Sequence, residues 1–101
     1  MIDLVGGLDQ SSLDRLRAAL GLSRVGRLGD DWDELFGEAI RTVAETSARL
    51  ELWRDVDTGQ WRLDVEGISE PPDPAVQSLL TVIRGEIVAA EVQVASVRRR
   101  R

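Results

Sequence analysis

The side chains that could do acid–base or metal chemistry in this chain are almost all carboxylates. The sequence has no histidine, cysteine, tyrosine or lysine, but it has eighteen aspartates and glutamates. Without imidazole, thiol or amine groups, a serine–histidine triad, a thiolate nucleophile, a cysteine–histidine zinc site and Schiff-base chemistry are excluded. A carboxylate could act as a base if burial raised its pKa, but no isolated acid stands out in an apolar run. We therefore expect a non-enzymatic protein with no cofactor and no metal.

The densest group of carboxylates comprises Asp30, Asp31, Asp33 and Glu34. Hard cations favour oxygen ligands, but this group lacks the spacing and the central glycine of an EF-hand loop. Acidic residues also gather at the start of a helix, where they cap free N–H groups and interact with the helix dipole. We interpret the group as a helix start rather than a metal site.

Two segments in the first half of the chain show helical spacing. Leu13, Leu16 and Leu20 follow a start that resembles a capping box at Ser11–Asp14 and precede Gly21, which predicts a short helix over 12–20. Apolar residues then repeat at intervals of three and four, and this pattern predicts an amphipathic helix over 31–47. The residues in that repeat are Trp32, Leu35, Phe36, Ala39, Ile40, Val43 and Ala44.

The middle of the chain changes to the alternation of a β-hairpin. Strands over 49–57 and 60–68 would flank a turn at Gly59, with a loop of two or four residues. We expect Val56 opposite Trp61 and Asp55 opposite Arg62, a register that places every apolar residue of the hairpin except Trp53 on one face. Residues 1–5 also alternate and could add an N-terminal strand.

The last apolar segment predicts a long helix over 74–97, which Asp73 and Pro74 would begin. Its apolar residues recur at a mean spacing of 3.5, typical of a helical seam that seals an oligomer, so we expect a homodimer. The central seam positions are Leu80, Ile83, Ile87, Ala90 and Val94. A competing interpretation ends the helix near Gly85 and makes part of 87–97 a strand, because that segment is rich in β-branched residues.

Charge and length bound the organisation of the chain. Its 101 residues are enough for one domain over 1–97, followed by a basic tail of four arginines, Arg98–Arg101. Without that tail the formal charge of −5 would be −9. An acidic body repels phosphate backbones and suits a basic protein partner. No apolar run is long enough to cross a membrane, and no signal peptide is visible, so we expect a cytoplasmic protein.

Two features point weakly toward nucleic acid. Leu16–Ser23 resembles the first helix and turn of a helix-turn-helix, although Gly26 and Gly29 would break the following recognition helix. The Arg98–Arg101 tail could grip a phosphate backbone or an acidic protein surface. All thirteen basic residues are arginine, a usage that we interpret mainly as high-GC coding and that suggests a bacterial source.

Trp53 is the residue of the hairpin that the apolar face does not explain. The expected register places it on the polar face with Asp55, Arg62 and Asp64, a composition typical of an interface anchor and its rim. We therefore expect a small protein-binding module of the immunity, inhibitor or adaptor type. The alternatives are a self-assembling structural subunit of a phage or bacterial assembly, and a nucleic-acid-binding regulator.

Overall fold

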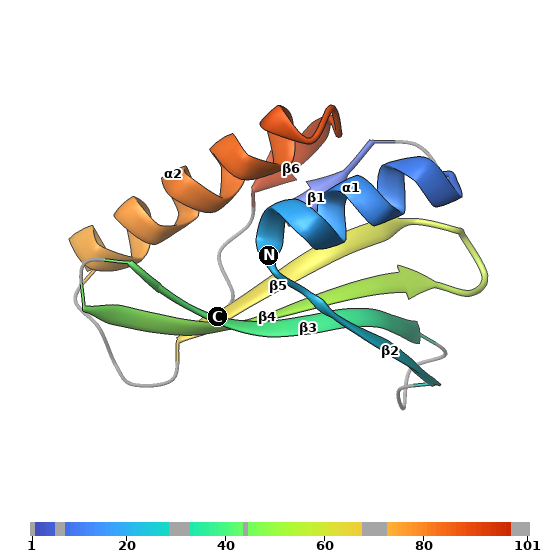
Figure 1. Ribbon diagram of the computed structural model, residues 1–101, viewed down its shortest axis with the longest axis horizontal. Helices are drawn as coiled ribbons and strands as arrows, with labels where there is room; N and C mark the ends of the chain where they lie inside the picture. Colours follow the sequence, from blue (N-terminus) through green and yellow to red (C-terminus); the bar gives the residue numbers. More distant parts are fainter. Residues whose placement is uncertain (1, 6–7, 29–32, 44, 68–72, 98–101) are drawn as a thin grey trace.

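Both helices lie on one face of an antiparallel sheet (Figure 1). The computed structural model describes residues 2–5, 8–28, 33–43, 45–67 and 73–97. These residues form β1 (Ile2–Leu4), α1 (Gln10–Leu20), β2 (Ser23–Leu28), β3 (Asp33–Val43), β4 (Thr46–Asp55), β5 (Trp61–Gly67), α2 (Asp73–Ala89) and β6 (Val94–Val97). The strand order is β2-β3-β4-β5-β1-β6. The predicted α+β class and the N-terminal strand are confirmed.

Helix α1 begins slightly earlier than the expected 12–20. The carboxylate of Asp9 accepts a hydrogen bond of 2.7 Å from the backbone N–H of Ser12, so Asp9 rather than Ser11 caps the helix. Gly21 ends the helix at φ 67°, in the left-handed region that glycine adopts without strain. Leu13, Leu16 and Leu20 face the core as predicted.

The helix predicted over 31–47 is wrong, because its described residues form β3 and the start of β4. The pairing of β3 with β4 shifts between Leu35 and Gly37, which marks a bulge at Phe36. One extra residue in a strand interrupts the period of two, so the apolar residues of β3 imitate helical spacing. Residues 31, 32 and 44 of the predicted helix lie outside the described residues.

The bulge also joins β3 to α1. The Phe36 carbonyl accepts hydrogen bonds from Nε and Nη2 of Arg17, at 3.0 and 2.6 Å. A Cβ atom on Gly37 would lie 3.0 Å from the Cβ of Leu22, so glycine lets β3 approach the turn after α1 closely. These contacts stabilise the strand conformation of β3 in a segment whose local sequence pattern favours a helix.

The β4–β5 hairpin has the expected faces but not the expected register. Arg54 rather than Val56 pairs with Trp61, and Trp53 rather than Asp55 pairs with Arg62. A shift of two residues keeps every side chain on its face, so alternation alone cannot detect it. The backbone N–H of Asp55 donates to the Gln60 carbonyl at 2.9 Å, which leaves the four-residue loop 56–59 with Gly59 at φ 72°.

The C-terminal helix is shorter than the predicted 74–97. Helix α2 passes through Gly85 and ends at Ala89, and Glu91 then adopts a left-handed φ of 63°. The strand alternative for the end of the chain holds for β6, although Gly85 is not where the helix stops. Val94–Val97 form a strand because β1 supplies a hydrogen-bonding partner that the sequence pattern does not reveal.

The main core lies between the helices and the sheet. Ile83 and Ile87 of α2 are fully buried against residues such as Leu16, Leu52 and Leu63. An ion pair joins the sheet to α2 beside this core. Arg41 of β3 donates two hydrogen bonds of 2.6 and 2.5 Å to the carboxylate of Glu86 in α2. This pairing raises the pKa of Arg41.

Candidate binding face of the sheet

The sheet face turned away from both helices carries the residues that the sequence singled out around Trp53. Trp53 of β4 lies directly opposite Arg62 of β5, and opposite residues in an antiparallel pair share a face. Asp64 follows two residues after Arg62 and lies on the same face. The structure therefore brings together three of the four residues expected at a partner site.

Trp53 is half-buried rather than freely exposed. The guanidinium carbon of Arg62 lies 5.7 Å from the centroid of the Trp53 ring, within cation–π range. On the other side, Trp53 pairs with Leu35 of β3, which is fully buried although it does not belong to the main core cluster. Trp53 is thus a half-buried aromatic residue on the far face, next to a buried apolar register partner.

Polar contacts extend from Trp53 across β5, β1 and β6. Arg62 Nε lies 3.3 Å from Asp64 Oδ1. Arg62 is also opposite Asp3 of β1, which is opposite Ser96 of β6. The hydroxyl of Ser96 donates a hydrogen bond of 2.7 Å to Asp3 Oδ2. The contacts position Arg62 beside Trp53 and hold the charged groups of this row in place.

The neighbouring row of the same face is acidic. Glu38 of β3 lies opposite Glu51 of β4, and Glu51 lies opposite Asp64 of β5. Like charges that face each other across strands destabilise a sheet. Within the described part of the chain, the carboxylates of Glu38 and Glu51 make no hydrogen bond or ion pair. At Glu38 and Glu51 the row therefore has negative charge that no described residue neutralises through an ion pair.

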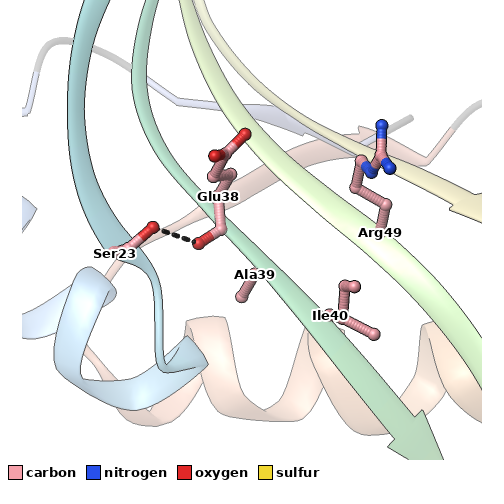
Figure 2. A pocket seen from close by; sticks show the side chains of 5 residues that line it. All are labelled: Ser23, Glu38, Ala39, Ile40 and Arg49. Atoms are coloured by element: carbon pink, nitrogen blue, oxygen red, sulfur yellow. Dashed lines mark hydrogen bonds between the residues drawn. The ribbon is translucent and has the colours of Figure 1, made fainter.

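A shallow hollow adjoins the acidic row at its β3 end. Ser23, Glu38, Ala39, Ile40 and Arg49 line it. Figure 2 shows Glu38 and Arg49 on the same side of the sheet, while Ala39 points toward the helices. Ile40 is 64% exposed and lies opposite Arg49, so this end of the face offers an apolar contact beside both signs of charge.

Asp55, the fourth expected site residue, is the last residue of β4, and its carboxylate is bound by the hairpin loop that follows. Its Oδ1 accepts hydrogen bonds of 2.9 Å from the backbone N–H groups of both Asp57 and Thr58. The bond from Thr58, followed by that from Asp57, lowers the pKa of the Asp55 carboxyl. Asp55 therefore helps to order the loop that joins β4 to β5.

The residues expected to form an oligomer seam do not form one helical stripe. Ile83, Ile87 and Ala90 are buried in the molecule itself, and Leu80 is half-buried against the same core. Val94 lies in β6, opposite Leu4 of β1. The apolar residues that predicted a contact between two chains instead pack within one chain. Homodimer formation stays a prediction.

Sequence reasoning missed Glu38 and Glu51 as members of the candidate face. The alternation of residues along 49–57 already placed Glu51 on the same face as Trp53. This pattern could have identified Glu51 as a member of the face. Glu38 could not be found because residues 31–47 were predicted to form a helix, and a helix would not place Glu38 opposite Glu51. Gly37 was a signal against that helix, because glycine in a helix interior costs about 1 kcal/mol of stability relative to alanine.

The described residues contain no group of three or more carboxylates placed to hold a metal ion. Asp30 and Asp31 of the densest acidic segment lie outside the described residues, as do Arg98–Arg101. Among the described segments, neither helix has the length and the apolar character needed to cross a membrane. The chemistry that this face offers is recognition through charge, hydrogen bonding and one aromatic surface.

Comparisons of the chain with protein-family models, with curated proteins and with solved structures give no match, so the description of this face rests on its own geometry.

Proposed function

We propose that this protein is a non-catalytic binding module, of the immunity, inhibitor or adaptor type, that recognises a basic protein through the far face of its sheet. The observation that carries the proposal is the row Glu38–Glu51–Asp64. Its charges oppose one another across strands and two of them lack a partner within the described residues. Arginine or lysine side chains from a partner would relieve this repulsion.

Trp53 supports the proposal as an anchor beside the row. Aromatic residues at the centre of a charged rim dominate many interfaces, because they bury a large area with little loss of side-chain freedom. The guanidinium of Arg62 lies over the Trp53 ring, and such a contact would reduce the ordering that binding requires. The formal charge of −5 would speed association with a basic partner and make the rate fall with salt.

The two alternative functions receive less support. Nucleic-acid binding through a helix-turn-helix would need a helix after Ser23, but β2 begins at that residue. Self-assembly through the predicted seam would need Ile83 and Ile87 at the surface, but both are fully buried. We therefore retain recognition of a basic protein as the proposal.

An affinity capture with matched variants tests the proposal. The immobilised protein is exposed to a lysate of cells from its source, and wild type is compared with the double variant Glu38→Gln plus Glu51→Gln. The control is Glu45→Gln plus Asp57→Asn, which removes the same charge from exposed positions off this face. Support would be one stoichiometric basic protein retained by wild type and control but lost from the Glu38, Glu51 variant. Equal retention by all three proteins, or no basic partner, would contradict the proposal.

A further inference from the structure

Strand β6 leaves one side of its backbone open at the edge of the sheet. It pairs with β1, and within the described part of the chain it has no strand on its other side. The pairing of the opposite edge strand, β2, with β3 shifts between residues 24 and 27, an irregularity that discourages edge-to-edge pairing. Residues 94–97 of β6 contain neither a charge nor a proline. The β6 edge is therefore a template for an added strand.

A groove runs along this edge between β6 and the outer flank of α2. Figure 1 shows β6 beside the C-terminal half of α2. Leu80, Arg84 and Val88 follow one another at intervals of four along that flank, and they line two adjoining hollows with residues of β6. Val94 contributes to one hollow and Val97 to the other.

The walls of the groove are apolar and accessible. Val88 is 59% exposed and Val97 is 40% exposed. Val94 and Val97 pair with Leu4 and Ile2, whose side chains face the core, so the two valines point toward the helix side of the sheet. Inward-pointing side chains of an added strand would contact the same apolar walls.

Arg84 supplies a charge at the centre of this groove. It lines both hollows and is exposed, and within the described residues it makes no ion pair or hydrogen bond. Glu91 lines one end of the groove, and its carboxylate already forms an ion pair of 3.9 Å with the guanidinium of Arg15. Among the residues that line the two hollows, Arg84 is therefore the cation that no described residue neutralises.

We propose that this groove binds an extended segment of a partner protein that adds a strand to β6. The segment would present apolar side chains toward α2 and, between them, a carboxylate that pairs with Arg84. Backbone hydrogen bonds along β6 would supply affinity, and the alternating side chains would supply specificity.

A second copy of this chain fits the groove less well than such a segment. A two-fold axis through the middle of β6 would bring the middle of one groove against the middle of the other. Arg84 would then approach its own copy, and like charges at an interface disfavour the pairing. This argument selects a partner segment that carries negative charge.

The test uses a labelled seven-residue peptide whose inward positions are valine, aspartate and valine, with threonine at the other positions. Fluorescence polarisation measures binding to wild type and to Arg84→Glu, whose unchanged melting temperature would confirm folding at this exposed site. We expect about a tenfold loss of affinity in Arg84→Glu. A peptide with lysine at the central position should recover the loss, and N-methylation of the peptide amides should abolish binding.

Two outcomes would overturn the proposal. One is absence of binding to wild type by the whole peptide series, or equal binding by wild type and Arg84→Glu. The other is a dimer in ultracentrifugation that excludes the peptide, which would make a second copy the occupant of the groove. The Glu38→Gln plus Glu51→Gln variant should bind the peptide as wild type does, so this proposal can fail or hold independently of the proposed function.

Discussion

The two faces of the β4–β5 hairpin use alternate residues of the same backbone for different purposes. On the helix side, Leu50, Leu52 and Leu63 are fully buried and Trp61 is 3% exposed. On the far side, the same strands carry residues that are polar or half-buried, namely Glu51, Trp53, Arg62 and Asp64. The helix side explains why the hairpin folds, whereas the far side bears charges that folding does not require. The second face is therefore the better place to look for function.

Charged residues show the same difference between the two sides. On the helix side, Arg41 pairs with Glu86, and Arg54 pairs with Glu34 at 3.0 Å while lying over the rings of Phe36 and Trp61. On the far side, Glu38 and Glu51 face each other without such a partner in the described chain. Arg62 and Asp64 are paired on the far side as well, so the difference between the two sides lies in Glu38 and Glu51, whose charges are available to a partner.

The largest effect should come from a charge in the helix-side core. Ile83→Asp places a carboxylate where the side chain is fully buried, which costs several kcal/mol, on the order of the whole stability of a domain. We expect loss of the cooperative thermal transition in circular dichroism. Val82→Asp, at a 39% exposed neighbour, is the control and should keep the transition. Similar melting curves for both variants would show that the assignment of buried positions in α2 is wrong.

The two hairpin tryptophans should separate stability from binding. Trp61→Ala removes a buried ring that lies 4.7 Å from the ring of Phe36, and it should cost about 3–5 kcal/mol of unfolding free energy. Trp53→Ala removes a half-buried ring and should cost about 1–2 kcal/mol of stability. The same Trp53→Ala change should weaken partner binding by about 2 kcal/mol or more.

Urea unfolding and titration calorimetry measure the two quantities for each tryptophan variant. If Trp53→Ala were the more destabilising change, Trp53 would belong to the core rather than to an interface. The far face of the hairpin would then no longer be a candidate for partner binding through Trp53.

Removal of one carboxylate from each side should have opposite consequences. Glu86→Gln leaves Arg41 half-buried without its ionic partner and should cost about 1–2 kcal/mol. Glu51→Gln removes one of two facing like charges, so the free energy of unfolding should stay within about 0.5 kcal/mol or rise slightly. Glu38→Ala should be equally mild. Denaturant midpoints at low and moderate salt would show whether the Glu51 effect is electrostatic, because salt should diminish it.

The smallest effect concerns the acid limb of stability. Hydrogen bonds from the backbone of Thr58 and Asp57 lower the pKa of Asp55 from its usual 3.8. A carboxyl whose pKa is lower in the folded state contributes stability above its unfolded pKa and loses it as pH falls through the folded pKa. Below about pH 4, wild type should therefore lose stability more steeply than Asp55→Asn. Parallel melting-temperature profiles for the two proteins would contradict the role of Asp55 in the loop.

Homodimer formation through α2 stays a prediction that ultracentrifugation at micromolar concentration can test. Val82 and Val88 are exposed on the outer side of α2 and could form such a contact. The buried residues of the expected seam could not. A clean monomer would remove the prediction and leave the β6 groove open to other partners.

Some of the fold could be predicted because its signals are local. Gly21 ends α1 through capping geometry and Gly59 supplies the positive φ of the hairpin loop, whereas the cap at Asp9 lies before the expected start at Ser11. The face of Trp53 followed from alternation, which survives a register error of two residues. The candidate site was therefore found in part, through Trp53, Arg62 and Asp64, before its neighbours were known.

Other elements could not be predicted because their determining contacts are distant in sequence. Residue 36 is bulged where Arg17 can bind its carbonyl, and this bulge conceals the alternation of β3. Val94 continues the helical spacing of α2, but the chain around it becomes a strand because β1, at the other end of the sequence, pairs with it. Glu38 joined the acidic row only once β3 was placed beside β4.

By itself, the sequence determined the exclusion of histidine, thiol and amine chemistry, the acidic charge, and the partition of the hairpin into an apolar and a polar face. These properties follow from residue identity and from a period of two, and neither depends on distant parts of the chain. The tertiary structure decided which segment became strand β3, which carboxylates face one another, and which edge of the sheet stays open. Those outcomes depend on strand pairing and on packing against the helices, and the energies of these contacts can exceed the local preference of a segment for a helix.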